Sequence, residues 1–415
     1  MKISNLRTHL VHCTIPEEQR VRSGAGLKLA RQAAIIEIET DTGLSGIGPC
    51  SFGSASLDLG SVASLVEHVF APMLIGEDPA HIERLWERIY YGVILRVFGP
   101  RSMGVAILSS IDIALWDLKG KTLGFPIYQL LGGSVHDRVF AYGSSIYWSR
   151  PDEAAAQARA FVAEGFRAVK LKIGLDIHND LQSLAAIREA VGPDIDIMVD
   201  ANMCYSSDLA LKVGRELEKY GVLFFEEPIS IDDVEGHRRL AQNLDLRIAT
   251  GENVYTRFGF LPFIRAEAID VVQPDASRTG GISEAKKIIE LAGAFHLHAA
   301  PHTFSDILTV AANLHVAAVT PNTMLLELDR TYNPLMTELC TEQLLVRDSY
   351  IELPRKPGLG FELNHDFMQA HPYHGELGIS MGGKPAAGLA HELLPDRQAR
   401  GLAVTTPLDD DREKR

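Results

Sequence analysis

Seven ionisable residues recur at nearly constant spacing through the middle of the chain. Each follows a short apolar run, and successive members lie 23–28 residues apart. They are Lys172, Asp200, Glu226, Glu252, Asp275, His302 and Glu327. Amphipathic segments with helical spacing separate them, for example residues 206–221 and 282–296. A strand and a helix at every step predict parallel strands joined by right-handed crossovers. Seven or eight such units over about 200 residues favour a closed β/α barrel with these residues at its catalytic end.

The N-terminal part has a different pattern, which predicts a separate α+β domain. Apolar, β-branched stretches indicate a three-stranded antiparallel meander at residues 2–13, 33–40 and 43–50. Helical spacing follows at about residues 58–75, 80–95 and 102–123. We therefore divide the chain into an N-terminal α+β domain (1–130), a barrel (131–340), a C-terminal segment that returns to the first domain (341–370), and a tail that we expect to be poorly ordered (371–415).

The composition excludes several classes of protein. The 40 Lys and Arg against 54 Asp and Glu give a net charge of −14, which disfavours binding to nucleic acid. No apolar run reaches the length of about 18 residues that a membrane-spanning helix needs. The cysteines are far apart in the sequence and predict neither a disulfide framework nor a zinc cluster. We therefore expect a protein of a reducing, cytoplasmic compartment that acts on a small molecule.

Three consecutive members of the series are carboxylates, namely Asp200, Glu226 and Glu252. A single acid at this position often caps the following helix, but three acids that converge on one point repel one another unless a cation lies between them. Hard oxygen ligands favour Mg²⁺. We therefore predict a magnesium site formed by these three residues. Glu227, beside Glu226, is expected to face the other way and to have a supporting or structural role.

Basic residues flank the predicted metal site. Lys170 and Lys172 are two residues apart, so a strand would place both on one face, where each would lower the pKa of the other and make a lysine base near neutral pH. The same pattern also occurs on solvated edge strands. Asp275 and His302 come from the next strand ends, and a carboxylate beside an imidazole orients the ring and raises its basicity. Lys172 and His302 would then flank a substrate from two faces.

The series resembles the mandelate racemase group of the enolase superfamily. The resemblance covers roughly residues 1–365 and rests on KLK (170–172), DAN (200–202), EEP (226–228), GEN (251–253), QPD (273–275), PH (301–302) and LLELD (325–329). It implies a modified TIM barrel of the (β/α)₇β type beneath an α+β capping domain. It also implies a homo-oligomer that uses Mg²⁺.

The resemblance further implies roles for individual residues. Lys172 would be one base, and Lys170 would tune it and contact the substrate carboxylate. His302 with Asp275 would be the second acid or base. Glu327, in its protonated form, would donate a hydrogen bond to the carboxylate as it becomes an enediolate. Asn202 would contact the substituent on the α-carbon.

Two polar segments are candidates for contact with the rest of the substrate. The stretch 15–31 contains Arg20, Arg22, Lys28 and Arg31, which could bind hydroxyls or a distal carboxylate, with Arg22 taken as the representative contact. A solvated run of charge explains the same residues equally well. The Ser- and Gly-rich stretch Ser51–Ser56 could line the pocket or form a plain turn.

Dehydration of a sugar acid to a 2-keto-3-deoxy acid is the function that we favour. The same residues would also serve a racemase, an epimerase or a cycloisomerase acting on a 2-hydroxy or related acid. A Schiff-base aldolase that uses Lys172 is a third hypothesis, which the three metal-type carboxylates disfavour. A non-catalytic protein gives no reason for seven ionisable residues at one end of a barrel.

Overall fold

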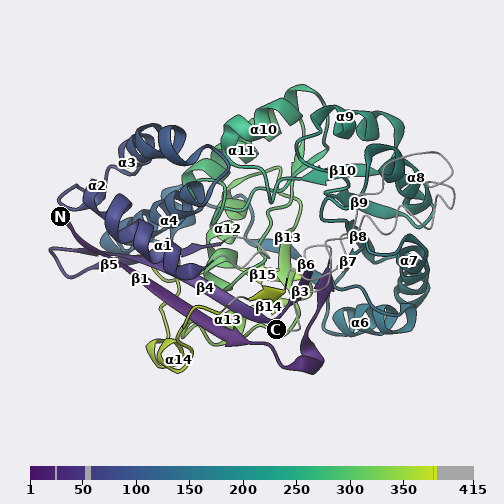
Figure 1. The fold of residues 1–415 in the computed structure, drawn as a ribbon, viewed down its shortest axis with the longest axis horizontal. Coiled ribbons are helices and arrows are strands. Elements are labelled where there is room, and N and C mark those ends of the chain that lie inside the picture. The colour runs from purple at the N-terminus through teal and green to yellow at the C-terminus, as the bar shows by residue number, and fades with distance from the viewer. Residues whose placement is uncertain (24–25, 52–57, 377, 381–415) are drawn as a thin grey trace, which may run out of the picture.

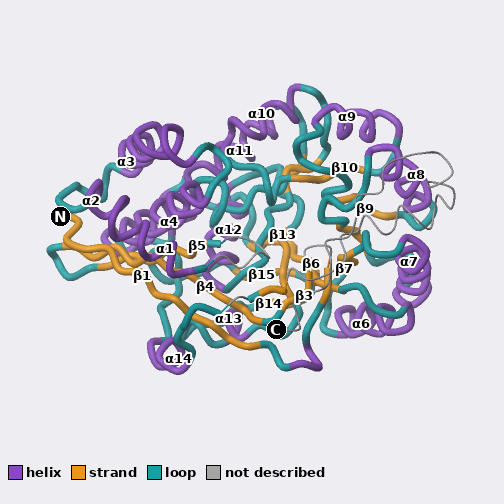
Figure 2. The backbone as a smooth tube through the Cα atoms, in the orientation of Figure 1, coloured by secondary structure: helices purple, strands orange, loops and turns teal. Residues whose placement is uncertain are grey.

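The computed structural model describes residues 1–23, 26–51, 58–376 and 378–380 (Figure 1). Its central feature is a barrel of parallel strands surrounded by helices, and an antiparallel sheet with its own helices lies to one side (Figure 2). Among the described residues, no helix combines the length and the apolar character that crossing a bilayer requires. The four cysteines are unpaired.

The N-terminal sheet has the order β1 (Ile3–Thr14), β4 (Ala30–Thr40) and β5 (Ser45–Cys50), with both pairs antiparallel. One helix, α4 (Met103–Leu123), is buried along most of its length and packs on β5. Gly48 permits this contact, because a Cβ atom there would lie 1.9 Å from the backbone oxygen of Ser110. The other helices of this region are α1 (Leu59–Leu65), the π-helical segment Val66–Phe70, α2 (Ala71–Leu74), α3 (Ile82–Ile89), the π-helical segment Tyr90–Phe98 and α5 (Ile127–Leu130).

The polar stretch between β1 and β4 contains short strands that its sequence did not indicate. After a short 3₁₀ helix (Glu17–Gln19), it forms β2 (Arg22–Ser23) and β3 (Gly26–Lys28). These two strands make a small antiparallel sheet with β16 (Ile379–Ser380), from the far end of the chain. Backbone hydrogen bonds that a local sequence pattern does not show therefore hold this segment in place.

The barrel is formed by eight parallel strands with seven helices between them. The strands are β6 (Arg138–Ile146), β7 (Ala168–Lys172), β8 (Asp196–Asp200), β9 (Val222–Glu226), β10 (Arg247–Thr250), β11 (Val271–Val272), β12 (His298–Ala299) and β13 (Leu326–Asp329). The helices are α6 (Pro151–Ala163), α7 (Ile177–Val191), α8 (Ser207–Glu218), α9 (Val234–Asn243), α10 (Thr256–Arg265), α11 (Gly281–Ala294) and α12 (Ile307–Val319). Pairing of β13 with β6, and a parallel bridge between Ala299 and Thr323, close the ring. This order confirms the predicted (β/α)₇β barrel.

A layer of side chains fills the barrel interior. One side chain comes from each strand or its immediate end, and together they form a separate buried cluster. They are Tyr142, Ala168, Met198, Phe224, Ala249, Val271, Ala300 and Leu325. Packed interiors of this kind are typical of β/α barrels. The barrel is therefore a solid support for polar groups at its carboxyl end.

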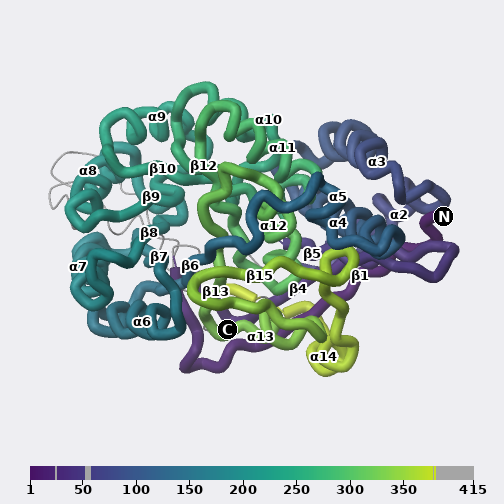
Figure 3. The backbone as a smooth tube through the Cα atoms, turned by 180° about the vertical axis from the view of Figure 1, so that it is seen from behind, coloured from purple at the N-terminus to yellow at the C-terminus, as the bar shows by residue number. Residues whose placement is uncertain are grey.

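The chain after β13 returns toward the N-terminal sheet through α13 (Pro334–Thr337), β14 (Val346–Arg347), β15 (Tyr350–Glu352) and α14 (His365–Ala370). Strand β15 pairs with β6 in antiparallel fashion, and α14 packs beside β1 (Figure 3). Residues 371–376 and 378–380 belong to the tail that we expected to be poorly ordered, yet Gln32 donates a hydrogen bond to the Glu376 backbone oxygen, and β16 pairs with β3. The rest of that tail lies outside the described residues. The domain boundaries stay a prediction.

Candidate active site

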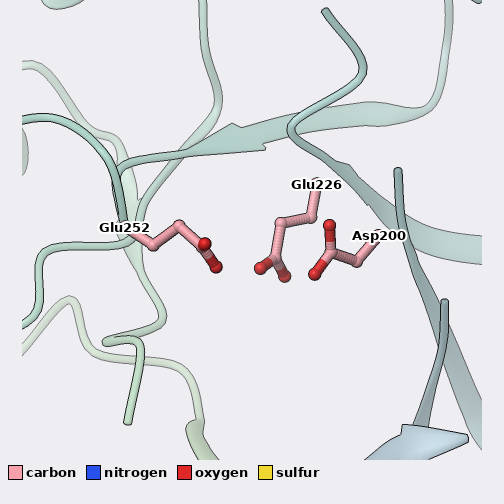
Figure 4. Close-up of side chains that lie close together, drawn as sticks. All are labelled: Asp200, Glu226 and Glu252. Carbon is pink, nitrogen blue, oxygen red and sulfur yellow. The ribbon is translucent and has the colours of Figure 1, made fainter. Parts of the chain in front are cut away.

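Three carboxylates converge at the carboxyl ends of neighbouring strands (Figure 4). Asp200 and Glu226 are the last residues of β8 and β9, and Glu252 lies two residues past β10. One oxygen from each of the three lies within 4.8 Å of the others. Asp200 and Glu226 are fully buried, whereas Glu252 is partly exposed. The structure thus brings the three predicted metal ligands together.

The backbone at the end of β10 explains how Glu252 is positioned. Gly251 has a φ of 152°, and a Cβ atom at this position would lie 2.7 Å from the backbone of Gln273. Glycine therefore lets the end of β10 approach the segment after β11. Gln273 uses this proximity, because its amide nitrogen donates to Glu226 Oε2 at 2.8 Å. The sequence contains Gln273 in the QPD motif, but spacing alone did not indicate that it orients Glu226.

The carboxylate cluster fits a hard divalent cation. All three side chains offer oxygen atoms, which Mg²⁺ prefers. Oε1 of Glu226 is buried and has no hydrogen-bond partner among the described residues, as expected of an atom meant for a ligand outside the chain. Burial and the charge of Asp200 raise the pKa of Glu226 to about 8, and a bound cation would relieve this repulsion.

The lysine pair on β7 lies against these acids. All five residues of β7 are buried, and Lys170 and Lys172 share the inner face. Lys170 Nζ is 2.7 Å from Glu226 Oε2 and 2.9 Å from Glu327 Oε1, and Lys172 Nζ donates to Asp200 Oδ2. Lys170 is thus an ionic bridge between two strands, and Lys172 faces the metal ligands.

The pKa of each lysine shifts opposite to the sequence-based expectation. Burial lowers the pKa of Lys172, and so does the charge of Lys170, but the charges of Asp200, Glu252 and Glu226 together leave the net pKa raised. The pKa of Lys170 is likewise raised well above its usual value, since Glu226 and Glu327 outweigh the effect of burial. The KLK motif by itself shows only two positive charges, which repel each other. The fold places negatively charged carboxylates from four other strands beside them.

The aspartate and histidine from β11 and β12 form a hydrogen-bonded dyad. His302 Nδ1 donates to Asp275 Oδ2 at 2.8 Å, and both residues are buried. The other oxygen of Asp275 accepts from Ser277 Oγ at 2.7 Å and from Asn313 Nδ2 at 3.1 Å. Burial lowers the pKa of His302, but Glu252 and Glu327 raise it to a net value above normal. The ring therefore favours its protonated form and is suited to give up a proton. Neither Ser277 nor Asn313 was predicted from the sequence.

Glu327 occupies the interior of β13, between the dyad and the lysine bridge. Its Oε1 accepts from Ser144 Oγ at 2.6 Å, and its Oε2 lies 3.7 Å from His302 Nε2. Burial raises the pKa of Glu327, but Lys170 and His302 reverse this effect and leave it well below normal. We expected a protonated donor here, but the charges of Lys170 and His302 lower the pKa of Glu327 and favour its ionised form. Its contact with the substrate carboxylate stays a prediction.

Asn202 lies at the edge of the acidic cluster. Its backbone nitrogen donates to Asp200 Oδ1 at 2.8 Å, and its side-chain amide is 3.4 Å from Asp200 Oδ2. Its φ of 42° is in the left-handed region, which asparagine tolerates better than most residues. The turn therefore holds the Asp200 carboxylate, and the contact of Asn202 with substrate stays a prediction.

In the basic segment 15–31, Lys28 rather than the predicted Arg22 lies near the site. Arg22 is exposed on β2, whereas Lys28 on β3 is 8% exposed, with its Nζ 4.2 Å from the centre of the Phe304 ring. Arg31, at the start of β4, pairs with Asp329 of β13 at 3.0 Å. Burial and the charge of Arg31 lower the pKa of Lys28 well below its usual value, and Lys172 adds to this effect. Residues 52–56 of the predicted Ser/Gly-rich stretch lie outside the described residues.

Comparison with known proteins gives the same assignment along most of the chain. Residues 17–132 match the family "Mandelate racemase / muconate lactonizing enzyme, N-terminal domain", and residues 153–367 match the family "Enolase C-terminal domain-like". The chain belongs to the mandelate racemase/muconate lactonizing enzyme family of the enolase superfamily. This confirms the family that the motifs indicated, and the protein is therefore an enzyme.

Individual relatives cover most of the chain. An arabinonate dehydratase of Saccharolobus solfataricus is 36% identical over 87% of this chain and 96% of its own. A D-galactarolactone cycloisomerase of Agrobacterium fabrum is 35% identical over 88% of this chain and 97% of its own. A crystal structure of a candidate mandelate racemase from Bordetella bronchiseptica RB50 is 48% identical with a TM-score of 0.89, and the match covers 91% of this chain and 97% of that one.

Proposed function

We propose that this enzyme removes the proton α to the carboxylate of a sugar acid and expels the β-hydroxyl as water, which leaves a 2-keto-3-deoxy acid. The observation that carries the proposal is the placement of two acid–base groups on either side of the carboxylate cluster. Lys172 contacts Asp200 from β7, and His302 Nε2 lies 3.3 Å from Glu252 Oε2 on the side of β12. A substrate carboxylate bound at the cluster would meet one such group on each face.

Asp200, Glu226 and Glu252 would hold Mg²⁺, in keeping with their oxygen donors and the unpartnered Oε1 of Glu226. When bound, the ion supplies a fixed positive charge against which the second negative charge of the enediolate is stabilised. Lys170 would add a second positive charge beside the substrate carboxylate. Both effects are needed because a proton α to a carboxylate is only very weakly acidic.

The remaining steps assign a proton to each acid–base group. Lys172, in its neutral form, would accept the α-proton, and the electron pair would pass into the substrate carboxylate. A cation held by Asp200 would offset the negative charge that raises the pKa of this lysine. His302 would then donate its Nε2 proton to the β-hydroxyl, so that the C–O bond breaks and water leaves. Asp275 would hold the opposite ring nitrogen and stabilise the charged ring before transfer. Glu327, in its ionised form, would keep Lys170 and His302 oriented toward the substrate.

Lys28 is the residue that we propose for contact with the distal end of the substrate, in place of Arg22. It is buried, it has no acidic partner within ion-pair distance among the described residues, and it lies over the ring of Phe304, two residues after His302. Arg31 is less suited to this role, because Asp329 already neutralises it. An amine with a lowered pKa can donate hydrogen bonds to hydroxyl groups of a sugar acid.

A cycloisomerase, racemase or epimerase is the second candidate, favoured by the similarity to the Agrobacterium fabrum cycloisomerase. These reactions share proton abstraction with the dehydratase and differ from it in the fate of the enediolate. A Schiff-base aldolase is disfavoured, because its lysine needs no metal, whereas Lys172 contacts Asp200, one of three converging carboxylates suited to a cation. We also propose a homo-oligomer, which light scattering coupled to size-exclusion chromatography tests.

The deciding experiment is a screen of mono- and diacid sugars with Mg²⁺, in which 2-keto acids are detected as semicarbazones. We expect at least one acid to give a product. Acids that give none are then incubated in D₂O and examined by NMR for deuterium at the α-carbon. Exchange without loss of water would replace the dehydratase by the isomerase branch, and neither product nor exchange with any acid would refute the proposed chemistry.

A further inference from the structure

Arg278 is a buried cation whose position the proposed mechanism does not explain. It lies on the loop between β11 and α11, three residues after Asp275, and is 4% exposed. Its Nη2 donates to Asn253 Oδ1 at 2.8 Å. Its Nε and Nη1 are buried without a hydrogen-bond partner among the described residues. Leaving two such donors unpaired costs free energy, so their placement calls for a reason.

Arg278 interacts with Tyr255 and also borders the carboxylate cluster. Its Nη1 lies 4.0 Å from Oε1 of Glu252, the least buried of the three candidate metal ligands. Asn253, which Arg278 holds, donates from its amide to the same Oε1 at 3.2 Å. The guanidinium therefore borders Glu252 directly and also acts on it through Asn253.

Asn253 extends the contact to the neighbouring strand. Its amide nitrogen also donates to Glu227 at 2.8 Å and 3.0 Å, to one carboxylate oxygen each. Glu227 is fully buried next to Glu226, and its φ of 40° is an uncommon backbone conformation for glutamate. A chain of contacts thus runs from β9 through Asn253 to Arg278 and the loop that carries Asp275.

We propose that Arg278 is a positioning residue that orients Glu252 for cation binding, both directly and through Asn253. The inference rests on the proposed role of the carboxylate cluster in holding Mg²⁺. Its unpartnered Nη1 lies 4.0 Å from Oε1 of Glu252, the oxygen that also accepts from Asn253, whereas Oε2 faces His302 Nε2 at 3.3 Å. The guanidinium therefore limits where the Oε1 side of this carboxylate can turn. Neighbours of this kind fix ligand geometry and typically change metal affinity 10–100-fold when removed.

The proposal makes a prediction opposite in sign to that of simple electrostatics. A positive charge near the cluster repels a cation, so removing Arg278 would tighten cation binding if charge alone mattered. If Arg278 acts by orienting Glu252, its removal weakens binding. The sign of the change therefore separates the two physical effects in a single measurement.

The test measures binding of Mn²⁺ alone to the full chain, with free Mn²⁺ followed by electron paramagnetic resonance. We expect Arg278→Met to raise the Kd at least 10-fold, Asn253→Ala to raise it in the same direction, and Arg278→Lys to restore part of the affinity. Arg257→Met is the matched control: it removes an arginine that pairs with the buried Glu284 at 2.7 Å on the adjacent helix, and it should leave the Kd unchanged.

Each outcome decides the proposal. Unchanged or tighter binding in Arg278→Met, with wild-type circular dichroism, would overturn it. If Arg278→Met does not fold, unchanged affinity in both Asn253→Ala and Arg278→Lys would overturn it equally. Weaker binding in the Arg257 control as well would assign the effect to general destabilisation. If wild-type protein binds no Mn²⁺, the metal-dependent function fails, and this failure is distinct from one seen in the variants alone.

Discussion

Lys170 Nζ lies 2.9 Å from Oε1 of Glu327, so an ion pair joins the second strand of the barrel to the eighth in its interior. Both side chains are almost completely buried. The same amine is 2.7 Å from Glu226, which makes one lysine the shared partner of two carboxylates that have different proposed roles. Removing such a residue leaves uncompensated charge in the barrel, which has a measurable consequence for stability.

Lys170→Met should lower the free energy of unfolding by about 3–5 kcal/mol, because it leaves the buried carboxylates without their common cation. Urea denaturation followed by circular dichroism measures this change. Lys286→Met, which removes a partly exposed partner of Glu290, is the control and should change stability by under about 0.5 kcal/mol. Equal effects in the two variants would contradict the bridging role.

Variants of Lys172 and His302 should distinguish proton abstraction from loss of water. Lys172→Met should abolish both α-proton exchange in D₂O and dehydration, because no base remains on that face. His302→Asn should retain exchange while dehydration falls about 10²–10⁴-fold, the usual contribution of a general acid. NMR of the substrate and the semicarbazone assay measure the two rates. The reverse pattern would make His302 the base and Lys172 the acid.

Mg²⁺ should stabilise the fold through the carboxylate cluster. At a concentration 100 times its Kd, a ligand that binds only the native state adds about 2.7 kcal/mol. Differential scanning fluorimetry should therefore show a higher Tm with Mg²⁺, and EDTA should reverse the increase. Glu252→Gln keeps the side-chain shape but loses the charge, so its Tm should respond far less. A full Mg²⁺ response in this variant would place the cation elsewhere.

Lys28→Met should affect substrate binding more than the chemical step. The side chain lies over Phe304, two residues after His302, and makes no ion pair with the carboxylate cluster among the described residues. We expect KM to rise about 10-fold, roughly the worth of one hydrogen bond to a polar group, with kcat changed much less. Arg22→Met, on the exposed part of the same small sheet, should leave both constants near wild type. Steady-state kinetics on the identified acid gives both constants.

His315 should make the protein less stable in mild acid. Burial lowers its pKa to about 4, and its Nδ1 accepts from the Tyr128 backbone nitrogen at 3.2 Å, a bond that only the neutral ring can make. The unfolded chain therefore binds more protons than the folded chain between about pH 6.5 and pH 4. Stability is fully present above that window and decreases as the pH falls through it, by roughly 3 kcal/mol in total.

Urea titrations at several pH values measure this dependence. His315→Gln should flatten the slope between pH 6.5 and pH 4, because the variant has no ring to protonate. His68→Gln, which removes an exposed histidine on the N-terminal helices, should keep the wild-type slope. An unchanged slope in His315→Gln would assign the acid sensitivity to other groups.

Residue spacing along the chain was sufficient to predict the barrel and the members of its polar cluster. The period of 23–28 residues corresponds to one β/α unit, that is, one strand and one helix. It therefore locates the strand ends without knowledge of the fold. It identified Asp200, Glu226 and Glu252, whose convergence follows from the parallel order of β8, β9 and β10. Motif and periodicity are local properties, and the sequence displays them directly.

The tertiary structure decided which charges face one another. The KLK motif shows two lysines that repel, but four carboxylates from other strands reverse the sign of both pKa shifts. The pKa of Glu327 is lowered because Lys170 and His302, 157 and 25 residues away in the sequence, lie beside it in space. Pairing of β3 with β16 joins residues more than 350 positions apart, and Lys28 rather than Arg22 is the buried cation on that sheet. A sequence therefore determines the inventory of charges and their order, whereas electrostatic interaction depends on distance and burial, which only the folded chain specifies.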